Sequence, residues 1–335
     1  MEFDTHLYSN MCTQFVETLL RRVESGSPHG YTSRIKFICT CNISRFVSKG
    51  FDITMTWYVA HRCRVCPLSA AGLAWLTSLV WIYTKVGLTG FASGVALSFL
   101  VTVPVFATIM WLGQRAPERR WLLLSSFLWG AAIAPFFSLI SQESLQALAD
   151  NLVGPTFGHW FRPLVITPVT EEAFKGLFLL WLLISRRSDF RGLLDGIVLG
   201  GMIGAGFAFT EQILYFGNVM VTYLGSAATD SAATTTFVMS LVLRGVLVPF
   251  MHPFFVAFIG LGVSYAAAVK DRSRQLVGVI VGFLFPILLH GLWDWAGLAA
   301  NDRFLIFKIY AFVMVPLFFG LVAFALVLRR RQPAF

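Results

Sequence analysis

Charged residues are scarce in this sequence. Aspartate, glutamate, lysine and arginine make up 13% of its 335 residues, whereas hydrophobic residues make up 57%. A soluble domain carries about 25% charged residues. Because so little charge cannot cover a water-facing surface, the composition indicates a polytopic membrane protein whose exterior faces lipid.

Cysteine is missing from the apolar part of the chain. The five cysteines are Cys12, Cys39, Cys41, Cys63 and Cys66. A thiol nucleophile in a membrane-embedded site is therefore excluded. Residues 1–66 are predicted to form a basic, poorly ordered arm, and residues 67–330 a transmembrane domain. For the arm two alternatives stay open: its paired cysteines could ligate zinc, or translation could begin at Met55.

Eight apolar runs are long enough to cross a bilayer as helices of about 20 residues. They are Ser69–Leu88, Phe91–Leu112, Trp121–Ile140, Ile166–Ser185, Gly192–Phe216, Phe250–Ala268, Leu276–Leu298 and Leu305–Leu328. The predicted fold class is therefore an all-α transmembrane bundle of about eight spans. A further apolar stretch, Thr236–Val248, either extends the sixth span or forms a separate interfacial or re-entrant helix.

Basic residues mark every second connection between these runs. Arginine and lysine cluster at 114–120, 186–191, 270–274 and 329–331, whereas residues 141–165 hold only Arg162 and residues 217–235 hold none. By the positive-inside rule both termini are predicted to be cytoplasmic, in a multi-pass protein of the cell membrane. The net charge of +9 then reflects membrane orientation and does not indicate nucleic-acid binding.

Ionisable side chains occur within or beside several of these runs, although each costs about 2.5–3.5 kcal/mol at mid-helix. They are Glu171, Glu172 and Lys175 in the fourth run, Glu211 in the fifth with Tyr215 one turn later, Arg244 and His252 at the start of the sixth, and His290 and Asp294 in the seventh. Pairs at i,i+4 could merely fasten helices together. At 1.5 Å per residue, however, all of them fall in the outer half of the bilayer. A shared depth predicts one common site.

The residue types are those of a catalytic zinc centre. Such a centre takes three histidine or carboxylate ligands and keeps one position for water, whose pKa the metal lowers. His252 and His290 can supply two nitrogens. The third ligand is Glu172, Glu171 or Glu211, and a second glutamate then serves as general base.

Three further residues have candidate roles in the same chemistry. Lys175 could restrain the paired glutamates or stabilise an oxyanion, and Tyr215 could donate to the same oxyanion. Asp294, one turn after His290, could hold that imidazole in the correct tautomer.

Four sequence elements resemble, in order, those of the PrsW family of intramembrane metalloproteases, which is related to the CAAX prenyl proteases and bacteriocin self-immunity proteins. Residues 171–175 (EEAFK) match E-E-x-x-K, residues 206–215 (GFAFTEQILY) match G-F-A-x-x-E-x-x-x-Y, Arg244 precedes His252-Pro253, and residues 290–294 (HGLWD) match H-x-x-x-D. The resemblance covers about residues 161–300. Gln212 departs from the asparagine that is more usual in the family.

This resemblance implies a metal-dependent endopeptidase that cleaves a membrane protein near its extracytoplasmic side. It implies that Glu171, Glu172 and His252 are essential, followed by His290. It also implies a substrate such as a single-span anti-sigma factor. Two alternatives remain open: an ion-coupled transporter, although the two halves show no internal repeat, and a catalytically silent immunity or scaffold protein.

Overall fold

The computed structural model describes residues 53–113, 120–226, 230–298 and 304–331, with side chains from residue 71 onward except at positions 157 and 159. The predicted arm lies largely outside these residues, so its cysteines and the proposed zinc ligation are not described. The chain divides into two units, Met1–Cys63 and Arg64–Phe335, and the helical bundle belongs to the second.

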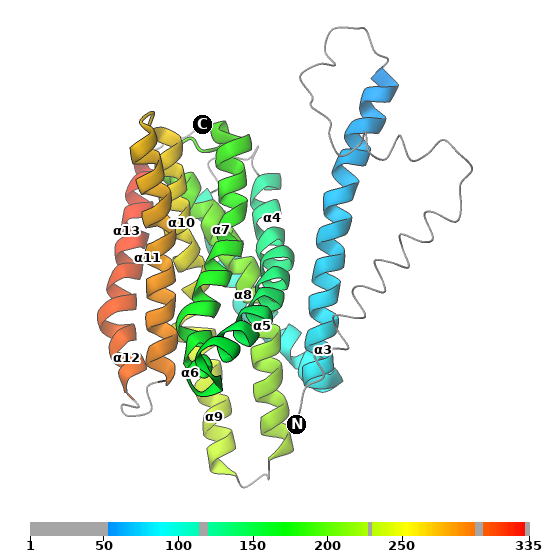
Figure 1. Ribbon diagram of the computed structural model, residues 1–335, viewed down its shortest axis with the longest axis vertical. Helices are drawn as coiled ribbons and strands as arrows, with labels where there is room; N and C mark the ends of the chain where they lie inside the picture. Colours follow the sequence, from blue (N-terminus) through cyan, green and yellow to red (C-terminus); the bar gives the residue numbers. More distant parts are fainter. Residues whose placement is uncertain (1–52, 114–119, 227–229, 299–303, 332–335) are drawn as a thin grey trace, which may run out of the picture. The chain divides into compact units, whose positions relative to one another are not determined.

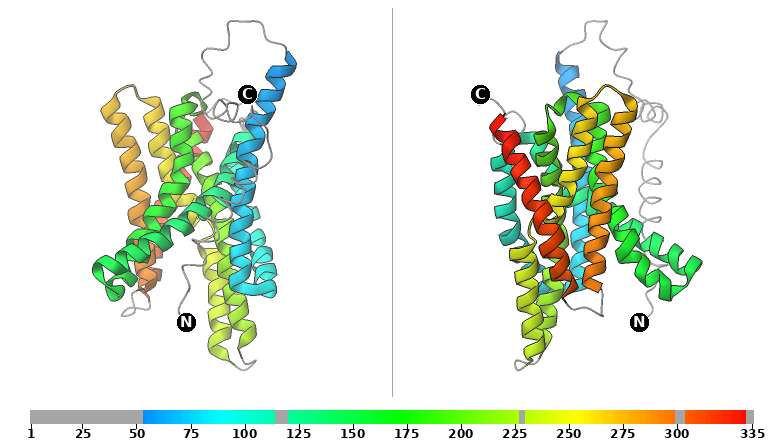
Figure 2. Two further views of the ribbon diagram at one scale, coloured as in Figure 1. Left: turned by 45° about the vertical axis from the view of Figure 1, so that its right-hand side comes forward. Right: turned by 90° about the vertical axis from the view of Figure 1, so that its left-hand side faces the viewer.

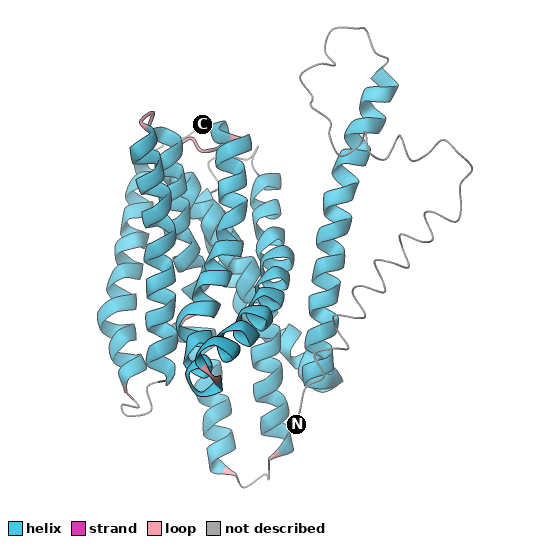
Figure 3. Ribbon diagram, in the orientation of Figure 1, coloured by secondary structure: helices cyan, strands magenta, loops and turns pink. Residues whose placement is uncertain are grey.

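Throughout the described residues the chain is helical, with short turns between helices (Figure 3). The predicted all-α membrane fold is confirmed. In chain order the elements are α3 (Ile53–Gly113), α4 (Arg120–Leu128), η3 (Trp129–Ile133), α5 (Ala134–Val153), α6 (Pro155–Phe161), η4 (Arg162–Ile166), α7 (Thr167–Ser185), η5 (Arg187–Asp189), α8 (Leu193–Gly225), α9 (Ser231–Val242), η6 (Leu243–Leu247), α10 (Met251–Ala268), α11 (Arg272–Leu298), α12 (Leu305–Ile309), η7 (Tyr310–Met314) and α13 (Val315–Arg331).

Six helical stretches among the described residues are long and apolar enough to cross a membrane. The first, Ala71–Gly113, has 43 residues and would be about 65 Å long if straight, twice the hydrocarbon thickness. Helix α7 has 19 residues and is also long enough, but it carries Glu171, Glu172 and Lys175. The number of spans thus stays a prediction, whereas the multi-pass character is established.

Helix α3 reverses direction at Gly87, where φ is 65°. Glycine adopts this left-handed conformation without a steric penalty. Before the reversal, the Trp75 indole donates to the Thr210 hydroxyl of α8 at 3.2 Å, and Val86 lies against Gly217. Because the numbers of the contacting residues rise together in the two helices, this half of α3 runs parallel to α8.

After the reversal the direction is opposite. Gly94 lies against Ile213 of α8, whereas Gly113 lies against Val198. The first two predicted spans, Ser69–Leu88 and Phe91–Leu112, are therefore the two arms of a helical hairpin, and Gly87 is its turn.

Two connections that were predicted to be outer loops are helical. Helix α5 continues to Val153, and α8 runs on to Gly225 before α9 begins at Ser231. The Asp230 side chain caps α9 by accepting hydrogen bonds from the first backbone N–H groups. The hairpin of α8 and α9 extends past the ends of the neighbouring helices (Figure 2). The stretch Thr236–Val248 thus belongs to α9 and η6, which a turn separates from α10.

Helix α8 is the central helix of the bundle and lies among α4, α7 and α10 (Figure 1). In its most apolar part 83% of residues are buried inside the protein, against 22% in α11. Three glycines let it approach α10 closely, since a Cβ on any of them would overlap a backbone carbonyl opposite. The pairs are Gly196 with Gly260, Gly200 with Val256 and Gly204 with His252. Small residues commonly allow such contact between membrane helices.

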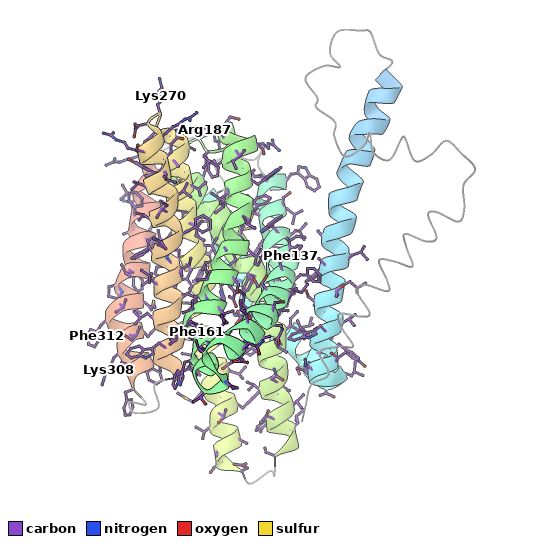
Figure 4. All side chains as sticks on the ribbon, viewed as in Figure 1. Phe137, Phe161, Arg187, Lys270, Lys308 and Phe312 are labelled. Atoms are coloured by element: carbon purple, nitrogen blue, oxygen red, sulfur yellow. The ribbon has the colours of Figure 1, made fainter. Side chains whose placement is uncertain are left out.

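Basic side chains gather at one end of the bundle. Arg187 and Lys270 lie there, whereas Lys308 and Phe312 lie toward the other end (Figure 4). Arg329 near the end of α13 packs its guanidinium 3.6 Å from the Trp111 ring centroid at the end of α3. This asymmetry is what the positive-inside rule requires of a cytoplasmic face.

Candidate active site

The ionisable residues singled out in the sequence converge from five elements on one buried cluster. Helix α7 supplies Glu171, Glu172 and Lys175, α8 supplies Glu211, η6 supplies Arg244, α10 supplies His252, and α11 supplies His290 and Asp294. Measured along each helix from its basic end, Glu171, Glu211, His252 and His290 lie about 21–27 Å deep. With about 30 Å of hydrocarbon, the cluster is far from the basic face.

Lys175 is the central cation of the cluster. Its side chain is fully buried, and its ammonium group lies 3.1 Å from Glu171 Oε2, 2.8 Å from Glu172 Oε1 and 3.1 Å from His252 Nδ1. An ammonium group has three N–H donors, so these acceptors use all of them. The Phe207 ring, with its centroid 3.9 Å away, adds a cation–π contact.

His290 approaches the second glutamate directly. Its Nδ1 lies 3.0 Å from Glu172 Oε1, and Phe255 stacks on the imidazole at 5.2 Å between ring centroids. Asp294 Oδ2 is 3.7 Å from His290 Nε2, which is longer than a hydrogen bond. Asp294 is therefore an electrostatic neighbour of His290 in this structure.

His252 belongs to a chain of contacts on the other side of Lys175. Its Nε2 lies 2.5 Å from Glu211 Oε2, and Arg244 Nη1 donates to Glu211 Oε1 at 3.0 Å. The Nε2 side of the His252 ring thus faces the Glu211 carboxylate, and its Nδ1 side faces the Lys175 ammonium. The imidazole rings of His252 and His290 are 5.9 Å apart between centroids.

Tyr215 is not brought to the carboxylate pair. Its hydroxyl lies 3.5 Å from Ser240 Oγ, and its ring lies beneath the Arg244 guanidinium, 3.9 Å away. The expectation that Tyr215 donates to an oxyanion has no support in this arrangement. Tyr215 follows Glu211 by one helical turn, so its phenol lies beside Ser240 of α9 instead.

One polar contact of the cluster was not predicted from the sequence. Gln142 of α5 is buried and its amide donates to Glu171 Oε1 at 3.4 Å. Gln142 fell in the stretch predicted to be a loop, and an uncharged amide does not stand out in an apolar run as a carboxylate does. Its only signal was a polar residue two positions beyond the predicted end of the third span.

Three side chains are close enough to hold a metal ion. Glu171, Glu172 and His290 each offer a ligand atom within 4.8 Å of the others, and all three are buried. Glu172 Oε2 is buried and has no hydrogen-bond partner. An unpaired buried carboxylate oxygen is costly unless a cation balances it, so the donor set fits a divalent metal.

Comparison with known proteins identifies the family of this chain. Residues 118–321 match the model of the PrsW family intramembrane metalloproteases. The chain is 24% identical over 187 residues to Protease PrsW of Oceanobacillus iheyensis, covering 56% of this chain and 74% of that protein. It is 22% identical over 222 residues to Protease PrsW of Clostridioides difficile, covering 65% and 86%.

No solved structure matches this chain. The family match covers more than half of the sequence and includes every residue of the cluster. Intramembrane proteolysis implies a membrane-protein substrate within a lipid environment. The chain therefore belongs to the PrsW family of intramembrane metalloproteases.

Proposed function

We propose that this protease is zinc-dependent and that Glu172, His252 and His290 hold the metal while Glu171 acts as general base. The observation that carries the assignment is the different surroundings of the two adjacent carboxylates. Glu172 is fully buried between Lys175 and His290. Glu171 instead lines a cavity between α3, α5, α7 and α8.

Histidine and carboxylate ligands favour zinc. A zinc–nitrogen bond is about 2.1 Å long, so two imidazoles on one tetrahedral zinc have ring centroids about 5 Å apart. His252 lies outside the close group of Glu171, Glu172 and His290, but its ring centroid is 5.9 Å from that of His290, close to that separation. When bound, zinc supplies a Lewis acid and a water whose pKa is lowered toward about 7.

The remaining residues position this set. Gln142 and Lys175 hold the Glu171 carboxylate, which is then aimed at the cavity and can take a proton there. Glu211 anchors His252 through Nε2, and Arg244 in turn holds Glu211. Asp294 lies 3.7 Å from His290 Nε2, where it can orient that imidazole.

The side of the membrane on which cleavage occurs follows from the orientation of the basic face. If that face is cytoplasmic, the cluster lies in the outer half of the bilayer and cleavage occurs near the extracytoplasmic end of the substrate's transmembrane segment. We propose a single-span regulatory protein, of the anti-sigma-factor kind, as the substrate.

The test compares membrane proteomes of cells that express wild type, Glu171→Gln or Glu172→Gln, together with the metal content of each purified protein. We expect both variants to stop the cleavage of the same single-span protein. Because only Glu172 is assigned as a ligand, Glu172→Gln should also lose zinc, as should His252→Ala and His290→Ala, whereas Glu171→Gln should keep one zinc per chain. Full activity in both glutamine variants would refute the paired-carboxylate mechanism.

A further inference from the structure

A small, largely apolar cavity of about 60 Å³ lies beside the cluster. The apolar residues that line it are Trp81, Ile82, Pro135, Leu139, Phe207 and Leu214. Glu171 and Glu211 also line it, so the cavity is continuous with the proposed active site. A cavity needs only about 10–15 Å³ of such space to hold a water molecule, so this one has room for one small apolar side chain.

Ser138 brings an unpaired polar atom to the cavity. The residue is 2% exposed, it lines the cavity, and its hydroxyl has no hydrogen-bond partner. Buried hydroxyls are rarely left in this state. In the same transmembrane stretch Ser126 donates to the carbonyl of Leu122, four residues earlier, at 2.8 Å. Ser138 follows the π-helical turn η3, a distortion that frequently occurs at functional sites.

A protease that cuts inside the membrane must provide polar groups that can hydrogen-bond its substrate's backbone. A helical substrate has to unwind locally before a peptide bond can be attacked. Lipid cannot satisfy the backbone N–H and C=O groups that unwinding frees. An unpaired hydroxyl beside the proposed general base therefore meets a need that the unwound substrate creates.

We infer that this cavity binds an apolar side chain of the substrate's transmembrane segment next to the cleaved bond, and that the Ser138 hydroxyl hydrogen-bonds the unwound backbone. The inference rests on the proposed function and adds to it the feature that selects the cleaved bond. Leu139 and Leu214, which contribute removable volume to the walls, set the largest side chain that the cavity accepts.

The first experiment enlarges the cavity. Purified zinc-loaded wild type, Leu214→Ala and Leu139→Ala are each incubated with detergent-solubilised membrane proteins. Mass spectrometry then maps the new peptide termini that each of these enzymes produces and that the Glu172→Gln variant does not. At one position flanking the cleaved bond, we expect both variants to favour phenylalanine or tryptophan over alanine about tenfold more than wild type, as a few methylenes of extra room allow. Leu284→Ala is the matched control, because this leucine of α11 is 53% exposed on the outside of the bundle.

The second experiment removes the hydroxyl. Ser138→Ala should lower kcat/KM about fivefold on a peptide that wild type cleaves, which is the loss of one ordinary hydrogen bond. Ser78→Ala is the matched control. Ser78 is equally buried, but its hydroxyl donates to the carbonyl of Ala74 at 3.1 Å and lies outside the cavity lining.

The outcomes separate the cavity assignment from the proteolytic mechanism. Enzymes that stay active with an unchanged residue preference in both leucine variants would overturn the cavity assignment and leave the mechanism intact. Equal kcat/KM for Ser138→Ala and wild type would overturn the role of the hydroxyl. Identical termini from wild type and Glu172→Gln would overturn the proposed function, and the cavity assignment with it.

Discussion

Replacing Lys175 by methionine is the sharpest test of the cluster's electrostatics. The substitution keeps most of the side-chain length but removes the charge and all three N–H donors. Glu171, Glu172 and His252 then lose the partner that lies within 3.1 Å of each of them. Two carboxylates, one of them fully buried, would remain without a cation between them.

The expected cost follows from that burial. Breaking a buried ion pair by removing one partner costs about 3–5 kcal/mol, a large share of the stability of a typical domain. A divalent metal would restore the missing charge. Zinc at 100 times its dissociation constant stabilises the folded state by about 2.7 kcal/mol. We therefore expect zinc to recover much of the loss in Lys175→Met and to stabilise wild type less, because in wild type it competes with the ammonium group.

The assay is thermal unfolding of detergent-purified protein, with a chelator and with excess zinc. Lys270→Met is the control, since Lys270 is exposed at the basic end of the bundle, and it should behave as wild type in both conditions. If Lys175→Met unfolded at the wild-type temperature in chelator, the ion pairs would contribute little. If zinc stabilised wild type and variant equally, Lys175 would not compete for the metal position.

Three further substitutions test how the cluster is held. Gly204→Leu should abolish cleavage and lower the unfolding temperature, because its side chain would collide with the backbone carbonyl of His252. Arg244→Met should reduce kcat/KM about 10- to 100-fold, as is typical when a residue that supports a metal ligand is lost, while zinc content measures whether the ligand itself has moved. Arg187→Ala should destabilise the protein by about 2 kcal/mol in thermal unfolding, since this guanidinium donates to three backbone carbonyls at the end of α10, whereas the exposed Arg186→Ala should leave stability and activity unchanged.

Much of the fold could be predicted because lipid imposes simple rules. Runs of about 20 apolar residues and alternating basic connections identify membrane helices. The same rules misplace the ends of α5 and α8. Helix α5 continues through Gln142 and Glu143, although polar residues such as these are typical of loops. Helix α8 likewise continues through Tyr223, and the serine–threonine stretch that begins at Ser231 forms α9. Once a helix leaves the hydrocarbon, hydropathy no longer reports its length.

The site residues stood out for a physical reason, since an ionisable side chain in a membrane helix needs a partner. Their pairing could not be predicted from the sequence. The i,i+4 spacing correctly suggests Glu171 with Lys175, but Lys175 also reaches His252, 77 residues away. Contacts of that kind depend on how α7 packs against α10. The uncharged groups of Gln142 and Ser138 gave no comparable signal.

The contacts of Lys175 imply that metal binding in this site is an exchange of cations. If the four carboxylates Glu171, Glu172, Glu211 and Asp294 are ionised and Lys175 and Arg244 are charged, the cluster carries a net charge of −2, which one divalent ion neutralises. Yet the ammonium group already satisfies acceptors from both α7 and α10. A metal held by Glu172 and His252 must displace Lys175 from at least one of them. The folded cluster should therefore persist when the metal is removed, unlike a zinc finger, which unfolds without metal. Wild-type protein stripped by a chelator should keep its helical circular dichroism and regain activity when zinc is returned, and irreversible loss of helix on stripping would show that the metal and not Lys175 holds these helices together.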